Sequence, residues 1–196
     1  MVEYFSGKLV LWLLSTNVIN ESEKEIYEFG LFQLVANFIQ FLLMIVIGLF
    51  MDELPAMIAY MVSFTNLRKY AGGYHAETIG KCFLTSMVIP FVFIFFLKIS
   101  YFSVTIEIFI WIIANIIIIL LAPIQSRNKP LDTSERKIFK RKALMVCFFE
   151  DLVILFCFTL CFWNIFDGFV FGQIIVTISL LTGRKILLDY NTNSNF

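Results

Sequence analysis

Two residues with nucleophilic and acid–base chemistry lie seven positions apart in one polar stretch of the chain. His75 is the single histidine, and Cys82 is the one cysteine of four that lies outside an apolar run. A thiol attacks as its thiolate, and a neighbouring imidazole removes the proton and later protonates a leaving amine. The pair predicts cysteine-based peptide cleavage. At this point the alternative, an interfacial histidine beside an idle thiol, is equally open.

The surroundings of the pair are electropositive. Arg68 and Lys69 precede it, and Lys81 adjoins the cysteine, so these cations favour the thiolate. One histidine and scattered thiols do not offer four ligands at the usual zinc spacing, and we expect no metal and no cofactor. The remaining cysteines are expected to behave as small hydrophobic residues: Cys147, Cys157 and Cys161.

The spacing of the pair restricts the backbone between its members. On a straight helix, seven residues at about 1.5 Å each would separate them by about 10 Å along the axis, whereas a nucleophile and its base need about 3 Å. The backbone between Ala76 and Lys81 is therefore not expected to be one regular helix. Gly80 and the pair Gly72-Gly73 are the places where we expect it to break.

Composition places the chain in a membrane. Of its 196 residues, 60% are hydrophobic, 15% are charged and 24 are phenylalanine, and the mean hydropathy is +0.86. Soluble domains are about a quarter charged and cannot hide so many rings. Residues 1–196 are expected to form a single integral membrane domain. No nucleic-acid partner is expected.

The hydropathy pattern predicts an all-α membrane helix bundle. Residues 4–14, within an N-terminal segment 1–28, are expected to form an amphipathic helix in the membrane interface. Six transmembrane segments follow, of which the second, third and sixth are short of the roughly 20 residues that cross a bilayer. They are residues 29–50, 54–67, 83–97, 104–122, 145–166 and 168–182.

Lysine and arginine fall on alternate connections, which sets the orientation. The rich stretches are the N-terminal segment, residues 68–82, residues 123–144 and the C-terminal tail, whereas the alternate connections hold only Lys98. Both termini, a catalytic loop at 68–82 and a basic loop at 123–144 are thus expected in the cytoplasm.

Acidic residues within apolar segments indicate a role, because they are costly there. Glu150 and Asp151 are expected either to pair with cations at the interface or to orient the catalytic histidine. Glu77 is another candidate for orienting that histidine. Together with Glu107, the two acids of the fifth segment also supply the competing hypothesis, a small transporter or a peptide exporter without enzymatic activity.

The arrangement Arg68-x3-Gly72-Gly73-x-His75-x6-Cys82 resembles the signature of the accessory gene regulator protein B (AgrB) family. The resemblance continues at Ala122-Pro123-Ile124 and at Asn128-Lys129-Pro130-Leu131. The basic residues up to Lys142 come after these two stretches. Chain length and the six-segment pattern also fit, so that the resemblance covers nearly the whole sequence.

This resemblance implies a cysteine endopeptidase of the bacterial cell membrane that matures a quorum-sensing peptide. Cys82 would be the nucleophile, His75 the general base and acid, and Arg68, Gly72 and Gly73 supporting residues. The precursor would have an amphipathic leader and an acidic tail, its product would be a thiolactone or lactone, and the enzyme would be a homodimer. Cations that suit the acidic tail are Lys129, Lys137, Lys140, Arg141 and Lys142.

We predict that Cys82 alkylates faster at neutral pH than the other three cysteines, because only it has polar, electropositive neighbours. His75→Ala should slow its alkylation, as measured by mass spectrometry of labelled peptides over time. Equal rates with and without the imidazole would remove His75 as the activating base.

Overall fold

The computed structural model describes residues 2–16, 18–74, 79–99, 103–125 and 131–193. Within these ranges the regular secondary structure is helical, apart from one isolated bridge between Gly72 and Ile124, which confirms the predicted all-α class. The helices are α1 (Val2–Ser15), η1 (Glu21–Glu23), α2 (Lys24–Phe50), α3 (Leu54–Ala71), α4 (Ile79–Ile99), α5 (Val104–Leu121), α6 (Thr133–Thr159) and α7 (Trp163–Asn193).

The chain divides into two compact units, Met1–Val46 and Ile47–Phe196. The first unit holds α1, which contains the short helix predicted at 4–14, and most of α2. A capping box precedes the short helix η1, which runs directly into α2. In it, the backbone N–H of Asn20 donates to the Glu23 carboxylate at 3.0 Å. Such a cap satisfies backbone donors that the first helical turn leaves without partners.

Each of the six predicted apolar segments overlaps a helix. Among the described residues, three helices are long and apolar enough to cross a membrane. These are Glu21–Phe50, Val104–Leu121 and Trp163–Asp189. The sixth apolar segment was predicted to be too short to cross a bilayer. It belongs to α7, which is long enough to cross. A crossing by all six remains a prediction.

The boundary between the fifth and sixth segments differs from the prediction. The predicted fifth segment runs to Phe166, whereas α6 ends at Thr159 and α7 begins at Trp163. Cys161 takes a positive φ of 59°, and the N–H of Phe162 donates to the carbonyl of Cys157 at 2.9 Å. This hydrogen bond closes a tight helix end. Hydropathy does not mark the turn because its residues are themselves apolar.

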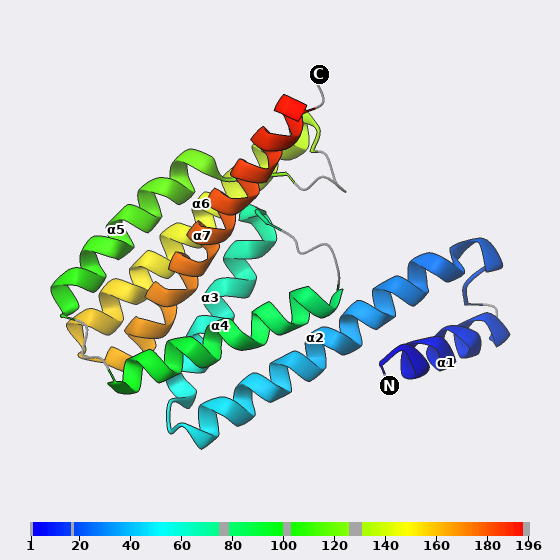
Figure 1. Cartoon of the computed structure of the whole chain (residues 1–196), viewed down its shortest axis with the longest axis horizontal. Coiled ribbons are helices and arrows are strands. Elements are labelled where there is room, and N and C mark those ends of the chain that lie inside the picture. Colours follow the sequence, from blue (N-terminus) through cyan, green and yellow to red (C-terminus); the bar gives the residue numbers. More distant parts are fainter. Residues whose placement is uncertain (1, 17, 75–78, 100–102, 126–130, 194–196) are drawn as a thin grey trace. The chain divides into compact units, whose positions relative to one another are not determined.

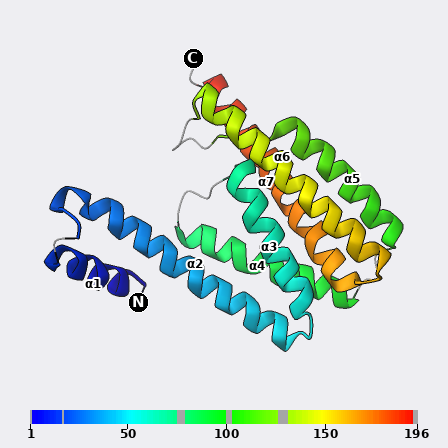
Figure 2. The ribbon, with the colours of Figure 1, turned by 180° about the vertical axis from the view of Figure 1, so that it is seen from behind.

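In the second unit α3, α5, α6 and α7 pack side by side, and α7 contacts the other three (Figures 1 and 2). The helix α4 packs on this group through aromatic rings. Phe93 of α4 stacks on Phe171 of α7 with centroids 4.0 Å apart, and the Tyr60 ring of α3 lies 5.5 Å from that of Phe171.

Glycines bring α7 against α3. A Cβ on Gly172 would lie 2.6 Å from the Cβ of Ser63, and a Cβ on Gly168 would lie 2.7 Å from that of Ala59. The spacing Gly-x3-Gly puts both glycines on one face, where small residues let two helix backbones approach closely. No larger residue fits at either position without moving the helices apart.

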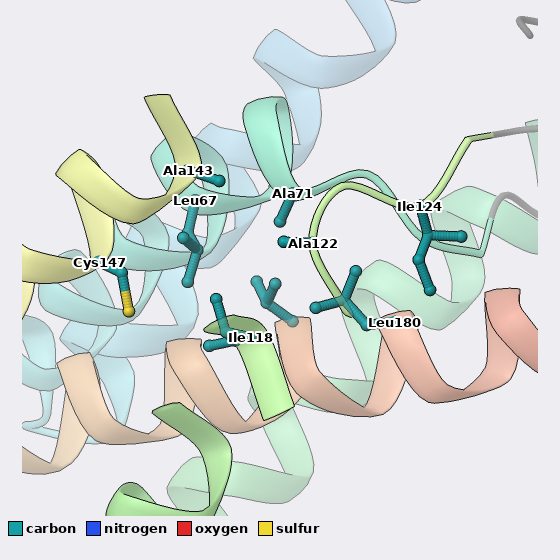
Figure 3. Close-up of a cluster of buried hydrophobic side chains, with 9 residues drawn as sticks. Leu67, Ala71, Ile118, Ala122, Ile124, Ala143, Cys147 and Leu180 are labelled. Atoms are coloured by element: carbon teal, nitrogen blue, oxygen red, sulfur yellow. The ribbon is translucent and has the colours of Figure 1, made fainter. Parts of the chain in front are cut away.

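One apolar cluster ties the four helices together near the C-terminal end of α3. Figure 3 shows Leu67 and Ala71 of α3 meeting Ile118 of α5, Cys147 of α6 and Leu180 of α7. As predicted for a thiol in an apolar run, Cys147 is buried in this cluster. The cluster therefore packs the C-terminal end of α3 against the other three helices.

Gly172→Ala should destabilise the protein, since the added methyl overlaps Ser63 and overpacking typically costs about 1–3 kcal/mol. Thermal unfolding of the purified protein in a mild detergent is the measurement. Gly30→Ala is the matched control, because a Cβ there meets nothing within 4 Å. A Gly172→Ala midpoint at or above that of the control would show that the close approach of α3 and α7 is not required.

Candidate functional site

The predicted motif begins on the last turn of α3 and leaves the helix through two glycines. Gly72 and Gly73 have φ angles of 70° and 115°, which residues with a side chain rarely adopt. The N–H of Gly72 still donates to the carbonyl of Arg68 at 3.1 Å. The predicted break at this glycine pair is confirmed, whereas Gly80 lies inside α4 and does not interrupt it.

Arg68 holds the exit from the helix in place. Its guanidinium donates to the carbonyl of Gly72 through Nη1 and to that of Tyr74 through Nη2. The planar fork of an arginine suits two acceptors at once, which a lysine does not match. Arg68, which the sequence analysis identified as a nearby cation and as a motif position, thus also binds the backbone of that motif.

Two distant segments bind the same turn. The N–H of Gly73 donates to the carbonyl of Ile124 at 3.2 Å, and the N–H of Ile124 donates to Ala71 at 2.9 Å. On the other side, the N–H of Tyr74 donates to the carbonyl of Ser179 on α7 at 2.9 Å. The turn is therefore held by the connection after α5 and by α7, as well as by Arg68.

Close packing explains the glycines of this turn and reveals a third. A Cβ on Gly72 would overlap the carbonyl oxygen of Ile124, and one on Gly73 would lie 2.7 Å from that of Ser179. On α7, a Cβ on Gly183 would lie 2.8 Å from the nitrogen of Tyr74. Sequence reasoning missed Gly183, because its partner lies more than a hundred residues away in the chain.

Three predicted site residues lie outside the described residues: His75, Glu77 and Lys129. Cys82 lies on the first turn of α4, and its side chain is not among those described. The described residues nevertheless include both ends of the motif, which are the Gly-Gly turn and the first turn of α4. His75 directly follows Tyr74, whose backbone is bound at both its N–H and its carbonyl, and Cys82 follows after the helix start at Ile79.

The other predicted cations lie on a helix rather than in a loop. The residues from Arg136 to Lys142 occupy the first turns of α6, which Asp132 caps by accepting from the N–H of Thr133 at 2.6 Å. The Ser134 hydroxyl and this N–H hold the pKa of the Asp132 carboxyl below its usual range. The cap explains why a run of like charges is helical here.

One cation of α6 and one of α3 lie over the same aromatic ring at the end of α3. The Nζ atoms of Lys142 on α6 and of Lys69 on α3 lie 5.5 and 5.4 Å from the centroid of the Tyr70 ring. A ring at this distance attracts both ammonium groups. Since Arg68 adjoins Lys69, positive charge gathers at this end of α3.

A buried polar cluster links all four packed helices below the apolar cluster. Gln173 of α7 donates through Nε2 to Glu150 at 3.3 Å and to Asp151 at 3.1 Å. The Ser63 hydroxyl of α3 donates to Glu150 at 2.9 Å, and Asn115 of α5 donates to Asp151 at 3.2 Å. Hydrogen bonds of this kind join helices within a bilayer.

Within the described residues, the two acids of α6 hydrogen-bond to groups that the sequence analysis did not propose, and their role in orienting His75 stays a prediction. The sequence offered interfacial cations or the catalytic histidine, whereas the hydrogen bonds of the described residues come from neutral groups, including the Trp111 indole at 3.1 Å from Asp151. Ser63, Asn115 and Gln173 were missed. The available signal was weak: each is one of several polar residues in an apolar stretch.

No group of three or more histidine, cysteine or acidic side chains that could hold a metal occurs within the described ranges. The absence of a metal stays a prediction. What the arrangement offers instead is a fixed backbone turn, flanked by cations, that leads directly into the histidine and cysteine of the motif.

Helices of this length and apolarity, with an anchored Gly-Gly turn at the end of α3, define a helical membrane protein with a polar motif at one end of its packed helices. A comparison with family models matches accessory gene regulator B over residues 5–180. The chain belongs to the AgrB family, whose members take part in processing the peptide of agr quorum sensing.

Two relatives come from Clostridium perfringens and are described only as AgrB-like. The protein from strain 13 is 29% identical over 145 residues, and that from strain SM101 is 30% identical over 145 residues. In both cases the match covers 70% of this chain and 67% of the relative. No solved structure matches the chain.

Replacing Arg68 by lysine should loosen the turn, because an ammonium group cannot bind both carbonyls as the fork does. A charge-assisted hydrogen bond contributes about 1.5 kcal/mol or more, so the amides of Gly73 and Tyr74 should exchange about tenfold faster. Hydrogen–deuterium exchange is the measurement. Arg184→Lys, at an exposed position of α7, is the matched control, and equal exchange in both variants would contradict the role assigned to Arg68.

Proposed function

We propose that the chain is a membrane-embedded cysteine endopeptidase that cleaves a quorum-sensing precursor near its C-terminus and promotes cyclisation of the product. The observation that carries this proposal is the triply held Gly72-Gly73 turn, which leads into His75 and then into the helix bearing Cys82. Membership of the AgrB family supports the substrate class.

The proposed reaction begins with transfer of the Cys82 thiol proton to the His75 imidazole. The thiolate sulfur attacks the scissile carbonyl carbon, and the imidazolium returns the proton to the departing amine as the C–N bond breaks. The acidic tail leaves with a new amino terminus. The rest of the precursor stays on Cys82 as a thioester.

Cyclisation follows when a side-chain thiol or hydroxyl of the peptide attacks this thioester. The new bond closes a thiolactone or lactone ring as the C–S bond to Cys82 breaks, and His75 passes the proton of the attacking group to the departing Cys82 thiolate. Exchange of one thioester for another needs little driving force, whereas hydrolysis is strongly downhill, so water has to be kept away from the intermediate. A site at the bilayer face suits that requirement.

Arg68 and the two glycines act as positioning residues in this scheme. By fixing the carbonyls of Gly72 and Tyr74, Arg68 restricts the backbone that carries the next residue, His75. A base 1 Å out of place loses much of its effect. Of the three acids considered for orienting the imidazole, Glu77 is the one within the motif, while Glu150 and Asp151 are engaged with Ser63, Gln173 and Asn115.

The substrate is proposed to approach along the membrane surface. An amphipathic leader would lie in the same interface as the enzyme and raise its local concentration. The acidic tail would be attracted to the predicted cations, of which Lys142 lies beside Tyr70 and the motif. Lys129 and the remaining cations of α6 would extend this attraction by long-range electrostatics.

The proposed setting is the bacterial cell membrane, crossed six times, with both termini and residues 68–82 and 123–144 in the cytoplasm. A homodimer is the oligomer that the family resemblance suggests. Six crossings put every stretch rich in lysine and arginine on one side.

We predict that a precursor whose ring-forming residue is replaced by alanine will trap the acyl-enzyme. Without an internal acceptor, a thioester on Cys82 should accumulate or drain slowly to a linear product. Intact-protein mass spectrometry of the full chain in liposomes detects the adduct, and hydroxylamine should release it. Cleavage of this substrate at the normal rate without an adduct would favour direct hydrolysis.

Three variants control the experiment. Cys82→Ala should leave the precursor intact, and Cys82→Ser should be nearly inert, because the same imidazole activates a serine hydroxyl poorly. Cys161→Ser, at an exposed cysteine between α6 and α7, should keep full activity. A peptide exporter without enzymatic activity would tolerate Cys82→Ser, and undiminished function in that variant would refute the peptidase.

A further inference from the structure

One face of α6 carries cations on its first turns and apolar side chains directly after them. We call this face the α6 stripe, and it borders a shallow hollow of about 480 Å³. Its residues recur at steps of three and four, which puts them on one side of a helix. They are Lys137, Lys140, Arg141, Leu144, Met145 and Phe148.

The stripe is exposed except at Leu144, which is half-buried. Its three cations are exposed, and at the apolar end the Met145 side chain is 47% and the Phe148 side chain 60% exposed. In water, an apolar surface of this kind beside charges would be costly. In a bilayer it is the expected arrangement, with charge at the level of the headgroups and hydrocarbon below.

The basic run of α6 therefore has two faces with different surroundings. Lys142 leaves the stripe and lies over the Tyr70 ring, which in turn packs on Phe139 with centroids 6.2 Å apart. That face adjoins the motif. The stripe instead borders its own hollow, whose lining comes from α6, so its cations serve a ligand that approaches from the side of the helix.

We infer that the α6 stripe binds an anionic phospholipid of the cytoplasmic leaflet. The phosphate would lie among Lys137, Lys140 and Arg141, and an acyl chain would run along Leu144 and Phe148. Charge directly above hydrocarbon is the chemistry of a phospholipid. An acidic peptide supplies the charge without the chain, and a zwitterionic lipid supplies the chain without net charge.

This inference rests on the proposed crossing of the bilayer by α6, but it does not rest on the chemistry of Cys82. Each lysine or arginine near an anionic leaflet contributes about 1 kcal/mol to binding. Removing two of the three cations should therefore weaken binding of the anionic lipid by roughly thirtyfold, and removing one by roughly fivefold.

The experiment compares two double variants that each lose two positive charges. Purified full-length protein in a nonionic detergent is titrated with phosphatidylglycerol or with phosphatidylcholine of the same acyl chains, and bound lipid is counted by native mass spectrometry. Lys140→Gln with Arg141→Gln removes two cations of the stripe. Lys69→Gln with Lys142→Gln removes the two that lie over Tyr70.

The expected result is that the stripe variant loses phosphatidylglycerol affinity by roughly thirtyfold, while the Tyr70 variant stays within about twofold of the wild type. Phosphatidylcholine should bind all three proteins equally weakly. If the stripe variant does not fold, as judged by its unfolding midpoint, Lys137→Gln replaces it with an expected loss of roughly fivefold.

Three outcomes would overturn the inference. Equal losses in the two double variants would show attraction by net charge alone, and unchanged affinity in the stripe variant would remove the site. Displacement of the lipid by glycerol 3-phosphate or by a synthetic acidic peptide at equal concentration would show a site for anions without the chain. Cys82→Ala should bind the lipid normally, so a failure of the proposed peptidase and a failure of this site are distinguishable.

Discussion

The close approach of α3 and α7 is the constraint on which the rest of the second unit depends. Gly168 and Gly172 permit it, since each faces the α3 backbone or a small side chain at a distance that leaves no room for a Cβ. The same two helices then supply both ends of the polar contacts that follow. Arg68 lies in the last turn of α3 and Tyr74 follows that helix, while Ser179 and Gly183 belong to α7. A wider separation would break the hydrogen bond from Tyr74 to Ser179 that helps to hold the turn before His75.

A second consequence of this approach is that polar side chains meet inside the apolar bundle. Gln173 reaches both carboxyl groups of α6 because α7 lies against α6 as well as α3. Within a bilayer water does not solvate such groups, so they must pair with one another. Each hydrogen bond therefore helps to keep the helices in one relative position. The buried polar cluster thus holds the helices together, while the Gly-Gly turn sets the path of the chain as it leaves α3.

The lysines and arginines near the end of α3 and at the start of α6 lie on two different surfaces. Lys69 and Lys142 gather over Tyr70 beside the motif, whereas the α6 stripe faces away from it. A one-residue step on a helix turns a side chain by about 100°, and Arg141 and Lys142 consequently belong to different surfaces. The proposed acidic tail and the proposed lipid would therefore make their direct contacts with neighbouring but different residues of α6.

The sequence by itself determined the membrane setting, the helical class and the motif, because hydropathy and fixed residue spacing are local properties. It also located the break at Gly72-Gly73, since two adjacent glycines favour a turn. It did not separate α6 from α7, where the turn around Cys161 is apolar, and it placed a break at Gly80 that α4 does not have. Only the tertiary structure decided that Ile124 and Ser179 hold the turn, that Gly183 gives it room, and that Ser63 and Gln173 bind Glu150. These are contacts between helices far apart in the chain, and a contact that depends on how helices pack leaves no periodic signal in either partner's sequence.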